Sequence, residues 1–91
     1  MLVRWTLAAA DDLEQVAIYL KQHYSEYAQS TVERLYAAAE SLSRFTMRGR
    51  PGRQQGTREL VVTRLPYIVV YAIRADVVWI VRVIHAARER G

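Results

Sequence analysis

The N-terminal half of the chain carries apolar residues at helical spacing in two stretches. Steps of three and four residues place such side chains on one face of a helix. The first face consists of Leu13, Ala17, Leu20 and Tyr24. The hydroxyl of Thr6 is a suitable N-cap for this helix, which we expect to run to about His23.

The second stretch has the clearest periodicity of the chain. Its apolar face consists of Ala28, Val32, Leu35, Ala39 and Leu42. Ser25 is the expected N-cap, and the helix should run to about Phe45. Because only a few residues separate the two stretches, we expect the helices to form an antiparallel hairpin.

The remaining segments are typical of strands and loops. Residues 2–5 can form a short strand, and residues 47–57 should form a loop because glycine and proline interrupt them. Further strands, rich in valine and isoleucine, are expected over residues 58–63, 67–73 and 77–84, with turns at 65–66 and 75–76. The pattern predicts a single α+β domain over residues 1–91, of order β-α-α-β-β-β. In it a helical hairpin packs on one face of a small, mostly antiparallel four-stranded sheet.

The last expected strand has apolar residues on both sides. One side would carry Val77, Trp79, Val81 and Val83, and the other Val78, Ile80 and Ile84 together with Arg82. Two helices cover only one face of such a sheet, so the other face needs a different cover. Another protein could provide it, as could the C-terminal tail or a second copy of the chain.

Charge is unevenly divided along the chain. Residues 1–40 hold three basic and six acidic side chains, whereas residues 41–91 hold ten and three. This division favours an anionic partner for the C-terminal half, either nucleic acid or an acidic protein, although a solvated basic surface has the same composition.

Several kinds of site and location are disfavoured by composition. The chain has no cysteine and only two widely separated histidines, so we expect neither a disulfide nor a metal site. No glycine-rich nucleotide loop opens a helix, and we expect no cofactor. The longest apolar run is about half the ~20 residues of a membrane span, and the first residues lack a signal-peptide pattern. We therefore expect a cytoplasmic protein that does not enter the membrane.

Several segments of the chain resemble toxins of the RelE/ParE superfamily. They are residues 3–6, 10, 12–13, 18–20, 49–52 (Gly-Arg-Pro-Gly), 56–62, 65–71 (Leu-Pro-Tyr-Ile-Val-Val-Tyr) and 82–88. The resemblance implies the toxin half of a bacterial type II toxin–antitoxin pair. A toxin of this kind arrests growth, and a cognate antitoxin wraps and neutralises it. The antitoxin also binds operator DNA for the complex.

The superfamily contains two activities on one fold. RelE-like members are ribosome-dependent endoribonucleases that cut messenger RNA, whereas ParE-like members bind DNA gyrase and poison it. The candidates for a nuclease site are Arg58, Arg82, His85 and Arg88. Among them, only His85 has a pKa suited to acid–base catalysis near neutrality. RelE-like toxins usually place an arginine after the aromatic residue where this chain has Tyr67 followed by Ile68, and no aromatic residue follows Trp79. These departures favour the ParE-like activity, with no confident catalytic residue.

The candidates for contact with a target or antitoxin are basic and aromatic. They are Arg48, Arg50, Arg53, Arg58, Arg82, Trp79, Tyr19 and Tyr27. Arginine and tyrosine are favoured at interface hot spots. Structural roles remain open for all of them: the loop arginines could be solvated, the strand arginines paired with carboxylates, and the tyrosines part of the edge of the core.

Overall fold

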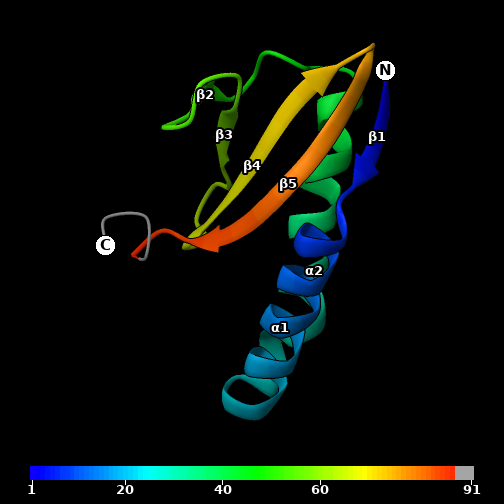
Figure 1. The fold of residues 1–91 in the computed structure, drawn as a ribbon. Helices are drawn as coiled ribbons and strands as arrows, with labels where there is room; N and C mark the ends of the chain where they lie inside the picture. Colours follow the sequence, from blue (N-terminus) through cyan, green and yellow to red (C-terminus); the bar gives the residue numbers. More distant parts are fainter. Residues whose placement is uncertain (88–91) are drawn as a thin grey trace.

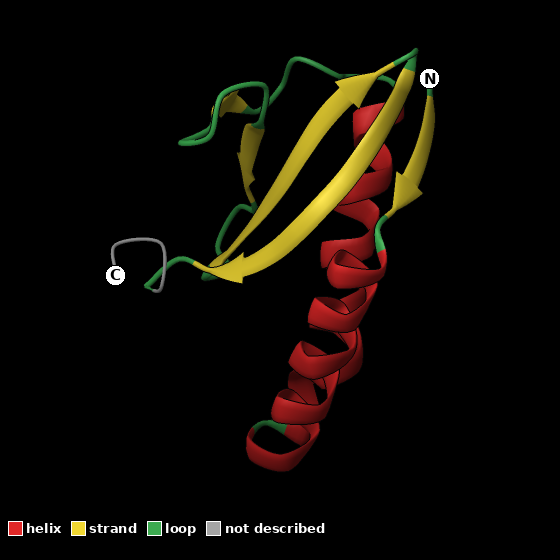
Figure 2. Ribbon diagram, in the orientation of Figure 1, coloured by secondary structure: helices red, strands yellow, loops and turns green. Residues whose placement is uncertain are grey.

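The computed structural model describes residues 1–87 and has two layers, a hairpin of two helices and a twisted sheet (Figures 1 and 2). The elements are β1 (Leu2–Trp5), α1 (Leu7–His23), α2 (Ser25–Glu40), the 3-10 helix η1 (Ser41–Ser43), β2 (Arg50–Pro51), β3 (Arg58–Val61), β4 (Tyr67–Arg74) and β5 (Val77–His85). Both helices lie on the same face of the sheet, and the tip of the hairpin extends beyond it (Figure 1). The predicted α+β fold is confirmed.

The sheet has five strands in the order β1-β5-β4-β3-β2. β1 runs parallel to β5, and every other neighbouring pair is antiparallel. The expectation of four strands was wrong because β2 pairs with β3 through Arg50↔Glu59 and Pro51↔Arg58. A two-residue strand that contains a proline and lies between two glycines is too short to show an alternating pattern in the sequence.

The first helix begins and ends where the sequence indicates. The Thr6 hydroxyl accepts a hydrogen bond from the N–H of Ala9 and donates one to the carbonyl of Val81, both at 3.1 Å. The N-cap therefore also attaches α1 to the last strand. Neither helix within residues 1–87 is long and apolar enough to cross a membrane.

The second helix differs from the expectation at both ends. Ser25 is its first helical residue and not its N-cap; Tyr24 holds that position, without a side-chain hydrogen bond. The helix stops at Glu40, before the expected Phe45, and continues as η1. The Ser41 hydroxyl donates to the carbonyl of Ala38 at 2.6 Å, a local hydrogen bond of the kind that competes with the regular helical pattern.

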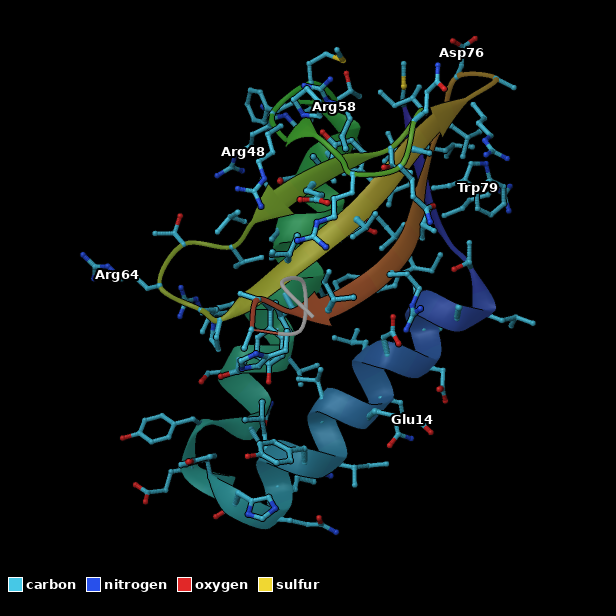
Figure 3. All side chains as sticks on the ribbon, turned by 60° about the vertical axis from the view of Figure 1, so that its left-hand side comes forward. Glu14, Arg48, Arg58, Arg64, Asp76 and Trp79 are labelled. Carbon is cyan, nitrogen blue, oxygen red and sulfur yellow. The ribbon has the colours of Figure 1, made fainter. Side chains whose placement is uncertain are left out.

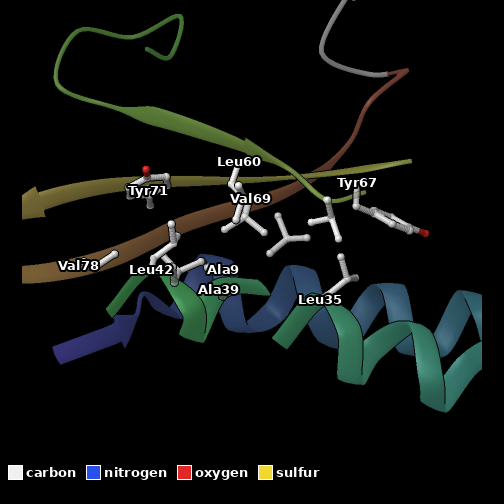
Figure 4. Packing of buried hydrophobic residues seen from close by; sticks show 12 residues of the cluster. Ala9, Leu35, Ala39, Leu42, Leu60, Tyr67, Val69, Tyr71 and Val78 are labelled. Atoms are coloured by element: carbon white, nitrogen blue, oxygen red, sulfur yellow. The ribbon is translucent and has the colours of Figure 1, made fainter. Parts of the chain in front are cut away.

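The core lies between the helices and the inner face of the sheet (Figure 4). Fully buried residues of the helical layer and sheet meet there: Ala9, Leu35, Ala39, Leu42, Val69, Tyr71, Val78 and Ile80. Alanines on both helices bring the helical backbone close to the sheet, because a methyl group occupies little of the space between the layers. Tyr71 is the largest of these fully buried side chains.

β5 does not keep a strict alternation between its faces. Ile80 pairs with Tyr71 and Arg82 with Val70, so Val81 is an extra residue in a β-bulge. The bulge puts Val83 in the core together with Ile80. The expectation that Val83 shares a face with Trp79 was therefore wrong, since a bulge shifts the parity of all later positions.

Both helices of residues 1–87 lie on one side of the sheet, and no helix covers its outer face (Figures 1 and 2). On that face Trp79 and Val70 are half-buried and Val61 is 51% exposed. Neighbouring side chains of the sheet itself bury Ala72, which lies opposite Trp79. The sheet thus offers a mixed apolar surface on the side away from the helices.

Candidate functional site

The arginine-rich loop before β3 is organised around one carboxylate. Glu59 is only 6% exposed. Its Oε1 accepts from Nη2 of Arg50 at 3.1 Å, and its Oε2 accepts from the backbone N–H of Arg53 at 3.4 Å. Arg50 is thus neutralised, whereas the side chain of Arg53 lies exposed.

Arg58 holds the same loop from the inner face of the sheet. Its guanidinium donates through Nη2 to the backbone carbonyls of Met47 and Gly49. The side chain is half-buried, and Nε lies fully covered. These contacts give Arg58 a structural function as a clamp on residues 47–49.

Tyr71 is a second anchor for this loop, one that the sequence analysis did not single out. Its hydroxyl donates to the carbonyl of Thr46 at 2.7 Å and accepts from the N–H of Gly49 at 2.9 Å. A Cβ at position 49 would lie 2.7 Å from Cε1 of Tyr71, so only glycine fits there. The signal available in the sequence was a tyrosine inside an otherwise apolar strand, because a buried hydroxyl needs partners.

Arg82 pairs with a carboxylate of the first helix. Its Nε and Nη2 donate to Asp12 at 2.7 and 3.0 Å, and the N–H of Val83 donates to the same carboxylate at 2.9 Å. The hydrogen bond and the charge of Asp12 raise the pKa of Arg82, against a small opposing effect of burial. β1 ends opposite Ile80, so Asp12 binds β5 where a longer β1 would have continued.

His85 lies exposed at the end of β5. Its Nδ1 accepts from the N–H of Ala87 at 3.1 Å, which places the proton of the neutral ring on Nε2. The ring meets Tyr67 edge-on, with the ring centres 5.4 Å apart.

The nuclease candidates that the structure describes do not converge. Arg58 lies opposite Tyr71 and His85 opposite Tyr67, four positions apart on β4, or about 13 Å along a strand. Arg82 is paired with Val70 in the sheet and so lies on the other face from Arg58. Arg88 lies outside the described residues.

The remaining candidates lie on different parts of the surface. Figure 3 shows Trp79 at the β5 side of the molecule and Arg48 at the β3 side. Tyr19 and Tyr27 lie on the helical hairpin, 51% and 61% exposed. The ring of Tyr19 is 4.5 Å from that of His23, measured between ring centres. The structure thus separates these candidates into at least three surfaces.

Comparisons with known proteins agree on one family. The family model described as "ParE toxin of type II toxin-antitoxin system, parDE" matches residues 3–90. The putative toxin Y4kP of Sinorhizobium fredii is 38% identical over 87 residues, which cover 96% of this chain and 90% of the relative. Toxin RelE2 of Caulobacter vibrioides is 41% identical over 86 residues, covering 94% and 96% respectively.

Solved structures share the fold. The chromosomal ParDE system from P. aeruginosa matches with a TM-score of 0.87 at 24% identity, over 93% of this chain and 95% of that one. The toxin-antitoxin complex RelBE2 from Mycobacterium tuberculosis matches with a TM-score of 0.57 at 28% identity, over 92% and 88%. The family match over nearly the whole length, with two toxin relatives above one-third identity, places the chain in the RelE/ParE superfamily, and it belongs to the ParE toxin family of type II toxin–antitoxin systems.

Proposed function

We propose that this toxin binds DNA gyrase and poisons it without catalysing a reaction of its own, and that a cognate antitoxin neutralises it. The observation that carries the proposal is the separation of Arg58, Arg82 and His85, each of which makes a structural contact. Relatives of the chain bear names from both branches of the superfamily, so the proposal is based on these residues.

RNA cleavage needs a base for the 2′-hydroxyl, a cation for the phosphate and an acid for the leaving oxygen, all within reach of one phosphodiester. Arg58 is occupied by loop carbonyls and Arg82 by Asp12. The Nδ1 of His85 already accepts a hydrogen bond, and about 13 Å along β4 separates His85 from Arg58. These positions favour a toxin that acts by binding.

A binding toxin needs exposed anchors on a rigid frame, and this chain has them. Trp79 lies half-buried on the outer face, and Arg53 lies exposed on a loop fixed by Glu59. Tryptophan and arginine are enriched among the residues that dominate binding energy. We assign gyrase contact to the outer face and this loop.

The antitoxin is proposed from the solved relatives and from charge. The neighbouring structures are a ParDE system and a toxin–antitoxin complex. The described part of the C-terminal half of this chain is strongly basic, which suits an acidic protein.

A supercoiling assay tests the target. Purified gyrase, ATP and relaxed plasmid are titrated with the toxin, and supercoiled and cleaved DNA are quantified. We expect loss of supercoiling with accumulation of cleaved DNA, reversed by the antitoxin, while a type I topoisomerase is unaffected. Unaffected gyrase, from a preparation that arrests growth when expressed in bacteria, would contradict the proposal. Messenger RNA cut on ribosomes by that preparation would establish the RelE-like activity instead.

A further inference from the structure

A hollow of about 280 Å³ lies at the side of the molecule where α2 passes the edge of the sheet. α2 and η1 contribute Arg34, Ala37, Ala38 and Ser41, and β3 with the turn that follows it contributes residues 60–63. Arg48 completes the lining from the loop before β2. Val61 also belongs to the outer face to which gyrase contact is assigned above, whereas the residues of α2 and η1 lie outside that face.

The strand that borders the hollow has an open backbone edge. The N–H of Val62 donates to the carbonyl of Tyr67 on β4 at 3.2 Å. Because successive residues of a strand direct their backbone groups to opposite sides, the N–H and C=O of Val61 point away from β4. β2 pairs only with Arg58 and Glu59, so no strand of the described chain lies beside Val61.

The segment before β2 does not continue the ladder along β3. The register of β2 and β3 would place Arg48 opposite Val61 if the ladder continued. The ladder ends at Arg50, and the Tyr71 hydroxyl binds Thr46 and Gly49 in the segment just before it. This segment is therefore anchored to the inner face of the sheet and does not pair with Val61. An open edge of this kind is a ready template for another strand.

Two arginines mark the ends of the hollow. Arg34 donates to the carbonyl of Thr63 at 2.7 Å, and Arg48 donates to the Ser41 hydroxyl at 3.2 Å. Neither has an ion pair with a carboxylate in residues 1–87. Positions 34 and 41 are seven residues apart on the helical layer, or about 10 Å. Carboxylates two residues apart on one face of an extended peptide lie about 7 Å from each other, and the long arginine side chains span the difference.

We propose that the open edge of β3 accepts an extended acidic segment of the cognate antitoxin as a sixth strand, with its carboxylates on Arg34 and Arg48. The inference rests on the proposed function, which supplies the antitoxin. A peptide strand pairs with the backbone of Val61 and also neutralises both arginines. A nucleic acid would neutralise the arginines but leave the edge unpaired, and the apolar wall of Ala37 and Ala38 offers it no contact of its own.

Amide hydrogen exchange on the purified toxin and on its complex with the antitoxin tests the strand directly. We expect the Val61 amide to exchange about tenfold more slowly or better in the complex, because it gains a hydrogen bond. The Arg74 amide, at the far end of β4, serves as the reference. A complex in which the Val61 amide exchanges as fast as in the free toxin overturns the inference and leaves the proposed function intact.

Two substitutions at one position separate the backbone contact from side-chain effects. Val61→Pro removes the N–H that faces the open edge but leaves the ladder to β4 intact, whereas Val61→Thr keeps that N–H. We expect the Kd for the antitoxin to rise about tenfold or more with proline and to stay within about threefold with threonine. Thermal unfolding of each free variant shows whether it folds. If the two variants bind the antitoxin with equal affinity, the proposed pairing of an antitoxin strand with β3 is overturned. If the proline variant does not fold, the amide exchange measurement tests that pairing instead.

Charge reversal tests the acidic character of the segment. Arg48→Glu should weaken antitoxin binding about tenfold, and Arg74→Glu, with the same change in net charge on an exposed residue outside the hollow, should change it less than about threefold. If the two charge reversals weaken antitoxin binding equally, the antitoxin is attracted by the general charge of the toxin, and the inference is overturned. The inference is also overturned if Arg48→Glu weakens binding while Val61→Pro keeps full affinity. An antitoxin that does not bind the unaltered toxin at all overturns the proposed function and the inference together.

Discussion

Asp12 and Arg82 join the first helix to the last strand through two hydrogen bonds, although 70 residues separate them in the sequence. The same carboxylate also accepts a hydrogen bond from the backbone N–H of Val83. The arrangement fixes α1 across the end of β1 and gives the charge of Arg82 a partner within the chain. A residue that looks catalytic in the sequence therefore makes a structural contact in the fold.

Replacing Asp12 should destabilise the protein in a graded way. Asp12→Ala leaves the Val83 N–H without its acceptor, so the free energy of unfolding should fall by about 1–3 kcal/mol. Asp12→Asn keeps an acceptor oxygen, and its loss should be smaller because water screens the half-exposed Arg82. Urea denaturation measures both. Identical losses would show that the charge, not the backbone contact, stabilises this junction.

His85→Ala should leave toxicity largely intact. The Nδ1 of His85 is occupied by the Ala87 N–H, and the structure gives the imidazole no partner suited to acid–base catalysis. Growth after induction, normalised to the amount of soluble protein, measures the effect. If the variant folds and no longer arrests growth, the nuclease activity becomes the better explanation.

The Tyr71 hydroxyl should contribute strongly to the stability of the loop before β2. Tyr71→Phe removes the partner of both Thr46 and Gly49, and we expect it to cost about 1–3 kcal/mol of stability. Tyr24→Phe removes the hydroxyl of an exposed ring and should change stability by less than about 0.5 kcal/mol. Gly49→Ala should be destabilising for a different reason, since its Cβ would overlap the Tyr71 ring. Equal stability of the two phenylalanine variants would contradict this account.

Stability at alkaline pH should depend on Tyr67. Burial, and to a lesser extent the charge of Tyr19, raise the pKa of Tyr67 above the ordinary tyrosine value of 10.0. The folded chain then holds this proton to higher pH than the unfolded chain does. The stabilisation is complete below pH 10 and is lost as the pH rises through the folded pKa.

Tyr67→Phe tests this linkage, because phenylalanine has no proton to lose. Thermal unfolding between about pH 8 and 11 should show a shallower decline for the variant than for the unaltered protein. Tyr27→Phe, at an exposed ring of the hairpin, controls for the general effect of alkali. Curves that decline in parallel for Tyr67→Phe and the unaltered protein would refute the role of Tyr67.

Local signals in the sequence predicted most of the fold. The Thr6 cap, both helices and the turn at Ala75 and Asp76 depend on neighbouring residues, and the structure confirms them. The bulge at Val81 and the two-residue β2 depend on partners elsewhere in the sheet. Single-sequence patterns do not contain that information.

The candidate site was less predictable for the same reason. The sequence identified Arg58 and Arg82 as chemically capable residues, but their partners are loop carbonyls and a carboxylate 70 positions away. The open edge at Val61 was not visible either, because it depends on where the pairing of β2 with β3 ends. Regular spacing along the sequence identifies residues that lie on the same helix or strand. The contacts of Arg58 and Arg82 join different elements, so spacing does not reveal them.

The parallel pairing of β1 with β5 also determines when the protein can fold. Leu2 is paired with Val77, so the first strand of the chain waits for almost the last one. At a synthesis rate of about 5–20 residues per second, roughly 4–15 seconds pass between the two. Until then β1 and β4 lack the strand that lies between them, and Asp12 has no strand to bind. The nascent chain therefore cannot complete its sheet before β5 has been synthesised.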